Sequence, residues 1–301
     1  MSPDRREGIN HDPRPEDAPS IGSRLGQLSA RIGELTSQSG LFYVVCARTS
    51  VRPAPVAAQR FGTRRLAEEA AVCATNYRAV LRELDQSLPV YDLVANEATT
   101  GAHWLDTTPE HAQSVQSSRR EWEPVPDSDY DARIDFCHAL AGVVFEALST
   151  AGYRGVDREC RATMDRVAGA DERCLTLLAA LDAQLDDLAA NARATVLRTA
   201  AGRLARSSAY GDPIEATLER LQSVDLLETY EIGRRGPEAT GTTRSVEATL
   251  TGYALGANDG TAPRLPITVD LLRRRPDLPI SSLRMTRLDD QVCRLELPTT
   301  Q

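Results

Sequence analysis

The sequence predicts an α+β protein. Apolar residues recur at helical spacing through the middle of the chain, and strand-like patterns fall near its two ends. Ala and Leu dominate the apolar residues and only 5% of residues are aromatic, which favours helix-rich packing over a β-sandwich. We predict a small α-β-β-α-β N-terminal unit, a central helical bundle and a C-terminal α-β-β-α-β-β sheet unit. A chain of 301 residues is long enough for such a division.

The N-terminal domain is predicted over residues 20–95, after a tail at 1–19 whose proline and charge content indicates disorder. Ser20 is expected to cap the first helix. One narrow apolar stripe follows, formed by Ile21, Leu25, Leu28, Ile32 and Leu35. We expect this stripe to lie on the following sheet. A short coiled-coil dimer contact is the alternative, but two heptads fall short of the three or four that make one convincing.

The stretch 40–94 is the most distinctive part of the chain. Its apolar run at 41–46 predicts a central strand covered on both faces, and a second short strand is predicted at 56–58. Thr63 is expected to cap a long amphipathic helix, and residues 90–94 return as a third strand. A helical crossover of this length permits parallel pairing between the first and last of these strands.

Residues 96–129 are predicted to be a disordered linker, because no apolar periodicity survives among their Pro, Ser and Thr residues. Both tryptophans of the chain, Trp104 and Trp122, lie in this linker. A tryptophan in a polar segment can dock on its own domain or on a partner, and we favour its own domain.

Residues 130–298 are predicted to form a helical bundle followed by a four-stranded α+β unit. The helix after the linker is apolar on nearly all sides between Ile134 and Leu148, so we expect it at the centre of the bundle. Short connections make the following helices antiparallel neighbours. Asp212 and Pro213 mark the start of another helix. The remaining elements predict one helix layer on a mainly antiparallel sheet.

The chain is acidic, with a formal charge of −8, and it contains no lysine. This composition is typical of halophilic proteins, although codon bias alone would also explain it. The negative charge argues against sequence-independent binding to phosphate backbones, so nucleic acid is not expected as a partner. No apolar run approaches the ~20 residues that span a bilayer. The N-terminus is polar, and we therefore expect a cytoplasmic protein without a membrane partner.

The sequence contains no recognisable catalytic or metal-binding motif. Its six cysteines lack zinc-site spacing and are interpreted as buried thiols. Neither a phosphate-binding glycine loop nor a nucleophilic serine elbow is present. We therefore expect no cofactor and no metal. Asp182, Asp186 and Asp187 are interpreted as a solvated helix face. His138 is expected on a helix rim, since its neighbour Cys137 points in another direction.

Several stretches resemble an uncharacterised protein family of halophilic archaea. They are Gly40 to Thr49, Arg52 to Val56, Arg60-Phe61, Tyr77 to Arg82, Leu88 to Val94, Phe136 to His138, Phe145-Glu146 and Tyr253 to Leu255. The resemblance implies a haloarchaeal cytoplasm, in agreement with the composition. It implies no activity and no catalytic residues.

The sequence thus predicts a non-enzymatic interaction or regulatory protein, with a protein partner contacted through the linker or the first helix. The alternative is an enzyme or small-molecule-binding protein with its site between the N-terminal unit and the helical bundle. The candidate binding residues are Arg48, Arg60, Tyr91, His138, Trp104 and Trp122. A DNA-binding regulator would need a positively charged face, which the sequence pattern does not reveal.

Overall fold

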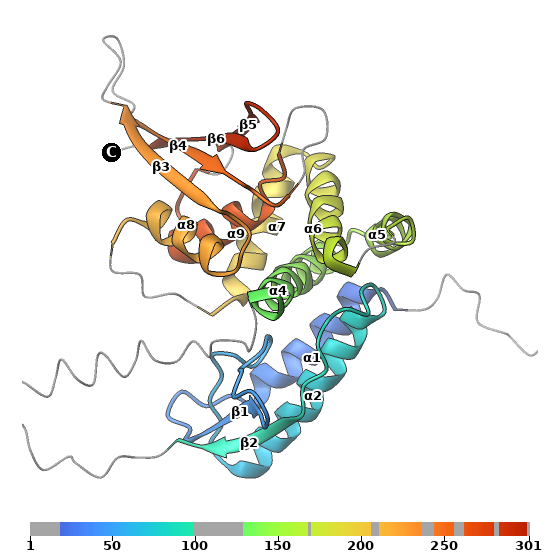
Figure 1. Ribbon diagram of the computed structural model, residues 1–301. Coiled ribbons are helices and arrows are strands. Elements are labelled where there is room, and N and C mark those ends of the chain that lie inside the picture. Colours follow the sequence, from blue (N-terminus) through green and yellow to red (C-terminus); the bar gives the residue numbers. More distant parts are fainter. Residues whose placement is uncertain are drawn as a thin grey trace, which may run out of the picture.

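The computed structural model describes residues 19–98, 129–167, 170–205, 211–235, 244–255, 262–279 and 283–299. Three layers are stacked on one another (Figure 1). The N-terminal unit, residues 19–98, lies at one end, helices around α4 form the middle, and a four-stranded sheet lies at the other end. Residues 129–299 are referred to as the C-terminal unit. The predicted α+β class is confirmed.

The N-terminal unit contains α1 (Ile21–Leu35), β1 (Phe42–Cys46), α2 (Arg64–Arg82) and β2 (Leu93–Glu97). The predicted caps are confirmed, because the side chain of Ser20 accepts a hydrogen bond from the Ser23 N–H and Thr63 accepts one from Leu66. The inner face of the sheet packs on a small core. Its buried members are Ile32, Leu35, Val44, Val56, Phe61, Ala67, Ala70, Ala71 and Ala74.

The two strands of this unit pair antiparallel, with Val44 opposite Ala95, so the expected parallel crossover is wrong. The loop after β1 explains the difference. It runs back along β1 until Phe61 forms an antiparallel bridge with Phe42. Helix α2 therefore starts beside the beginning of β1 and carries the chain back to its end. Residues 56–58 lie in a turn rather than the predicted second strand, since Val56 N–H donates to Pro53 and Gln59 N–H donates to Val56.

Helix α1 packs mainly on α2 and α4 rather than on the sheet. Only the last part of its apolar stripe, Ile32 and Leu35, reaches the core beneath β1. The first part, Ile21 and Leu25, is buried with residues of α4. The whole stripe was expected to lie on the sheet, but its N-terminal half packs on the apolar surface of α4 instead.

The helical layer consists of α4 (Asp129–Thr150), α5 (Val156–Met164), α6 (Ala170–Asp186) and α7 (Ala190–Arg203). Helix α4 is central, as predicted: it contacts α1 on one side and α6, α7 and α9 on the other. The predicted linker overlaps the end of β2 and the first residue of α4. Residues 99–128 of this linker, including Trp104 and Trp122, lie outside the described residues, as does most of the predicted N-terminal tail.

The C-terminal sheet follows the predicted pattern of two helices and four strands. These are α8 (Pro213–Ser223), β3 (Thr229–Arg235), β4 (Arg244–Thr251), α9 (Leu265–Arg274), β5 (Arg284–Arg287) and β6 (Val292–Thr299). The strand order is β3-β4-β6-β5 and every pair is antiparallel. Helices α8 and α9 lie on one side of the sheet (Figure 1). The inward side chains of Leu250, Met285 and Leu295 are buried, whereas Arg294 and Glu247 form an ion pair.

One apolar core runs through both units. Residues of the N-terminal unit belong to the same buried cluster as α4 and the helices beyond it; they are Ile21, Leu25, Tyr77, Val80, Leu81, Leu84 and Leu88. The junction between the units, which the sequence suggested as the place of a site, is therefore filled with packed side chains. Polar residues are set into this packing on one face of α4.

Candidate functional site

The strongest candidate site is the face of α4 that meets the N-terminal unit. It carries Asp135, His138 and Glu146, with Gly142 between the last two. Spacings of three, four and four residues place these positions on one side of a helix. We call Asp135, His138 and Glu146 the polar face of α4. Each of the three takes part in a separate polar cluster that joins the two units.

Asp135 forms the first cluster with Arg78 and Tyr91. One Asp135 oxygen lies 2.9 Å from the Arg78 guanidinium, and the other accepts a 2.5 Å hydrogen bond from the Tyr91 hydroxyl. The guanidinium also stacks 4.4 Å from the centre of the Tyr91 ring and donates to the Pro89 carbonyl. Burial and the neighbouring Asp135 raise the pKa of Tyr91, so the phenol stays protonated as a donor.

His138 forms the second cluster with Asp85, and both side chains are buried, at 1% and 0% exposure. The His138 Nε2 atom lies 3.2 Å from Asp85 Oδ2, within ion-pair distance although outside hydrogen-bond geometry. The His138 Nδ1 atom lies 2.8 Å from the Ile134 carbonyl and must carry a proton there.

Asp85 is also held from the other side of the cluster. Ser87 donates its N–H and its hydroxyl to Oδ1, and Arg173 Nε approaches the same atom at 3.2 Å. Burial opposes ionisation of Asp85, but the contacts with His138 and Ser87 outweigh it and lower the pKa to about 2. Arg173 also donates to the carbonyls of Leu84 and Met164. This arginine therefore ties α6 to the end of α2 and to α5.

Glu146 forms the third cluster and is 2% exposed. It accepts a 2.7 Å hydrogen bond from the Tyr77 hydroxyl of α2, and Arg203 of α7 approaches its other oxygen at 3.2 Å. Ser29 of α1 is a further hydrogen-bond donor to this carboxylate. Burial raises the pKa of Glu146 despite these partners. Four helices thus meet at one carboxylate.

The three clusters hold the units together rather than present a reactive group. A Ser-His-Asp relay needs the histidine between the other two, whereas here Ser87 and His138 both bind Asp85. Side chains with exposures of 1% and 0% do not reach a substrate in this arrangement. The buried position of His138 also corrects the expectation that it lies on a helix rim.

The predicted candidate residues fall at two places. Tyr91 and His138 lie at the polar face of α4, and Arg48 donates to the carbonyl of Val90 beside Tyr91. Arg60 lies elsewhere, 5.3 Å from the centre of the Tyr43 ring. Trp104 and Trp122 are outside the described residues.

Of these clusters, sequence reasoning singled out Tyr91 and His138 and missed the other members, among them Asp85, Asp135, Glu146 and Arg173. The signal for Asp135 and Glu146 was present, because they form a polar stripe with His138 along an otherwise apolar helix. Asp85 and Arg173 had no comparable signal, since each lies in an ordinary helix-end or amphipathic context.

A small cavity of about 20 Å³ lies between α6, α7 and α9, with Asp182, Asp186, Arg193 and Arg264 among its lining residues. This volume accommodates about one water molecule. Asp182 is 8% exposed, which corrects its assignment to a solvated face. Its Oδ2 accepts a 3.1 Å hydrogen bond from the Arg264 N–H, and α9 has no cap from the side chain of Arg264 itself. Asp182 therefore caps α9 from a neighbouring helix.

Acidification should stabilise the protein through Asp182. Burial raises the pKa of this carboxyl to about 6, above 3.8 for the free side chain, although backbone N–H donors and Arg264 act in the opposite direction. A raised pKa means that ionised Asp182 costs stability above pH 6 and that this cost disappears as pH falls from about 6 to about 4. We expect a gain of about 2–3 kcal/mol over that window.

The matched variant for this prediction is Asp182→Asn, which keeps an acceptor for α9 but does not titrate. The difference in unfolding free energy between wild type and variant, measured by urea denaturation at pH 7 and pH 4.5, isolates the contribution of this carboxyl. A difference that does not change with pH would contradict the prediction.

Within the described ranges, no three His, Cys, Asp or Glu side chains come together as metal ligands. In the same ranges, none of the helices is both long and apolar enough to cross a membrane. All six cysteines are free thiols, and five of them are buried.

Two family models match the chain. A domain of unknown function, DUF7551, matches residues 133–301, and a second, DUF7552, matches residues 24–99. The first covers more than half of the chain. The chain belongs to the DUF7551 family. No curated protein and no solved structure matches it.

The polar face of α4 lies where these two families meet. The DUF7551 match begins inside α4, just before Asp135, and the DUF7552 match ends just after β2. The predicted resemblance to an uncharacterised family is confirmed at this level. The three polar clusters thus join one domain of unknown function to another.

Proposed function

We propose that this protein is a non-enzymatic interaction or regulatory protein, in which the DUF7551 unit holds the DUF7552 unit in a defined position. The observation that carries this proposal is the polar face of α4. Two of its three polar side chains, His138 and Glu146, are buried, Asp135 is partly buried, and each is paired with a group from another helix or loop. Such closed clusters fix geometry and leave no group directed at a substrate.

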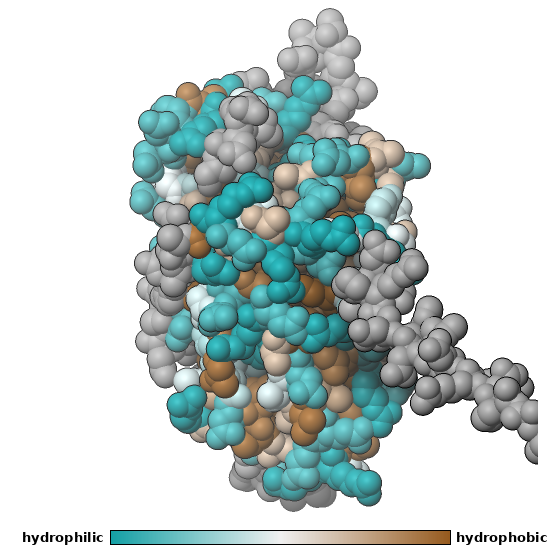
Figure 2. Space-filling view, turned by 90° about the vertical axis from the view of Figure 1, so that its right-hand side faces the viewer, coloured by the Kyte–Doolittle hydropathy of each residue, from teal (hydrophilic) through white to brown (hydrophobic). Residues whose placement is uncertain are grey.

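We further propose the domain division predicted from the sequence, with domains at 20–95 and 130–298, a tail at 1–19 and a linker at 96–129. The two family matches, 24–99 and 133–301, support it because they end and begin close to these boundaries. A partner contact through the linker is favoured over one through α1, since α1 buries its apolar stripe inside the protein. The face shown in Figure 2 is mostly hydrophilic, with hydrophobic residues in small separate patches.

A cytoplasm of high salt is the proposed setting, that of a halophilic archaeon. The acidic, lysine-free composition supports it, because carboxylates and arginines keep a surface hydrated where salt screens charge repulsion. Refolding yield measured from low to multimolar KCl tests this setting, and a maximum at low salt would contradict it.

The interaction itself is tested with the full-length chain as bait in multimolar KCl, beside a Trp104→Ala/Trp122→Ala double variant. A stoichiometric partner retained by wild type and lost by the variant is the expected result. The melting temperatures of the two proteins, measured in the same buffer, separate loss of a partner from loss of docking on the protein's own domain. A strictly monomeric protein that retains nothing under these conditions would count against the proposal.

The second candidate is a small-molecule-binding protein or enzyme with its site between the units, favoured by the convergence of His138 and Asp85 at that junction. A thermal-shift screen against nucleotides and small anions separates the two functions. A ligand at 100 times its Kd adds about 2.7 kcal/mol of stability. Binding that disappears in a His138→Gln variant would favour this second candidate.

A further inference from the structure

Strand β2 lies at an open edge of the small two-stranded sheet. The far side of β1 is occupied, because Phe61 and Phe42 exchange two backbone hydrogen bonds there. In the described ranges, no strand pairs with the far side of β2. An open strand edge presents a row of backbone donors and acceptors to which another strand can pair.

The hydrogen bonds to β1 show which backbone groups face this open edge. Ala47 N–H donates to the carbonyl of Asp92, the residue immediately before β2. The bonding direction alternates along an antiparallel strand, so the even-numbered residues of this stretch bond to β1. The N–H and C=O groups of Leu93, Ala95 and Glu97 therefore face outward.

The outward groups are only partly occupied. Arg64, the first residue of α2, donates to the Ala95 carbonyl at 3.2 Å, and the Glu97 N–H donates to the side chain of Asn96. Within the described part of the chain, no hydrogen bond occupies the Ala95 N–H or the outward groups of Leu93. The middle of β2 thus offers backbone groups to a further strand.

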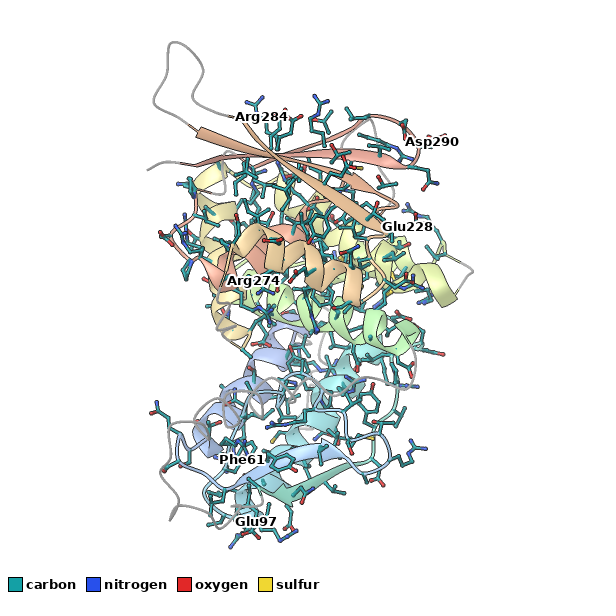
Figure 3. All side chains as sticks on the ribbon, turned by 60° about the vertical axis from the view of Figure 1, so that its left-hand side comes forward. Phe61, Glu97, Glu228, Arg274, Arg284 and Asp290 are labelled. Carbon is teal, nitrogen blue, oxygen red and sulfur yellow. The ribbon has the colours of Figure 1, made fainter. Side chains whose placement is uncertain are left out.

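Two exposed charges accompany this edge, Arg64 and Glu97. The Arg64 guanidinium reaches Ala95 and lies 5.7 Å from the centre of the Phe42 ring. Glu97 stands opposite Phe42 in the ladder, so both charges lie on the sheet face that covers the core. Neither charge forms an ion pair with a described residue. Figure 3 places Glu97 at the tip of the N-terminal unit, remote from the C-terminal sheet.

A second copy of this edge complements both the backbone groups and the charges. A two-fold axis beside Ala95, the middle residue of β2, pairs the strand along its whole length. Leu93 then stands opposite Glu97 of the second copy, and no like charges face each other along the strand. The axis is perpendicular to the sheet, so the α2 faces of both copies lie on the same side. Glu97 of each copy therefore comes next to Arg64 of the other.

We propose that β2 pairs antiparallel with β2 of a second copy, which joins two small sheets into one sheet of four strands. Ala95 exchanges both backbone hydrogen bonds with Ala95 of the second copy, and Arg64 turns from the Ala95 carbonyl to Glu97 of that copy. A second copy is favoured over an unrelated strand because its own charges supply the complement to Arg64 and Glu97. This interface goes beyond the proposed interaction function and does not depend on it, since it involves β2 and the start of α2 alone.

The test measures the dissociation constant of the full-length dimer by sedimentation equilibrium, at the lowest KCl concentration that keeps the native near-ultraviolet circular dichroism. Wild type should dimerise reversibly. Arg64→Glu and Glu97→Arg should each weaken the dimer by about tenfold or more, because two like-charge contacts replace two attractive ones. An equimolar mixture of these two variants should recover the wild-type affinity, because each copy then meets opposite charges on the other. A contact within one copy would not be restored by mixing.

Two further variants define the edge. Ala95→Pro removes an outward N–H without breaking a bond to β1, and it should also weaken the dimer by about tenfold or more. Arg65→Glu makes the same charge change at the next residue, which is also exposed, and should leave the dissociation constant within about twofold. Wild type that stays monomeric, a mixture that fails to recover affinity, Ala95→Pro that dimerises like wild type, or an Arg65→Glu effect equal to that of Arg64→Glu would overturn the proposal.

Discussion

Replacing Asp85 with alanine is expected to destabilise the protein by about 3–5 kcal/mol. Asp85 is completely buried and faces the His138 ring, Arg173 and the N–H and hydroxyl of Ser87. Without the carboxylate, the Arg173 guanidinium loses its countercharge in this cluster, and the Ser87 hydroxyl loses its buried acceptor. Removing one partner of a buried ion pair costs far more than the pair itself contributes, because the remaining charge keeps its desolvation penalty.

The control for this substitution is Glu83→Ala, two residues earlier. Glu83 pairs with Arg24 and Arg161, but its side chain is 37% exposed, so its loss should cost no more than about 1 kcal/mol. Urea denaturation followed by far-ultraviolet circular dichroism measures both variants at pH 7. An Asp85→Ala cost below that of Glu83→Ala would mean that the cluster does not hold the units together.

Asp85 also sets the response to strong acid. Its folded-state pKa of about 2 lies below the 3.8 of the free side chain. Stability from this carboxylate is therefore present above about pH 4 and is lost as pH falls from about 4 to about 2, by roughly 2 kcal/mol. The pH dependence is opposite to that of Asp182, whose contribution to the unfolding free energy increases as pH falls from about 6. The wild-type stability should therefore pass through a maximum near pH 4–5 as far as these two groups determine it.

Local features of the fold were predictable because they depend on neighbouring residues. Ser20, Thr63 and Asp212 each accept a hydrogen bond from an N–H two or three residues ahead, and their positions were recognised as helix caps. The direction of β2 was not predictable in this way. It depends on the path of the loop before α2, which brings Phe61 back to Phe42.

The same distinction applies to the candidate site. His138 was predicted to lie on a helix, but its partner Asp85 lies 53 positions earlier and in the other unit. That pair is buried because the end of α2 packs near α4, and this packing cannot be predicted from a local sequence pattern. The stripe formed by Asp135, His138 and Glu146 could have been recognised from the sequence. Polar side chains on one side of a buried apolar helix are costly unless partner groups lie opposite them.

An apolar junction alone would tolerate sliding of one unit over the other. The three clusters place a polar side chain at three heights along α4, and each is matched to different groups: Arg78 with Tyr91, Asp85, and Tyr77 with Arg203. Any shift along the helix would separate all three at once. The clusters therefore specify the register of the units more than they add to the net stability.

Gly22→Ala and Gly26→Ala, one helical turn apart on α1, should have effects of opposite sign. A Cβ atom at Gly22 would lie 2.2 Å from the carbonyl oxygen of Phe145 and 2.8 Å from Cβ of Ser149, both on α4. The Phe145 carbonyl is a backbone group and cannot move away by a change of side-chain rotamer. Helix α1 would therefore have to shift away from α4. We expect a loss of about 3 kcal/mol, at the upper end of overpacking in a filled core.

A Cβ atom at Gly26 would meet nothing within 4 Å, and alanine is the better helix former. Gly26→Ala should therefore stabilise the protein by about 0.5–1 kcal/mol. Urea denaturation of both variants measures the signs directly, and limited proteolysis reports whether Gly22→Ala frees the N-terminal unit. If both variants changed the unfolding free energy in the same direction, α1 would not approach α4 closely at Gly22. The packing of the two units described above would then be wrong at this contact.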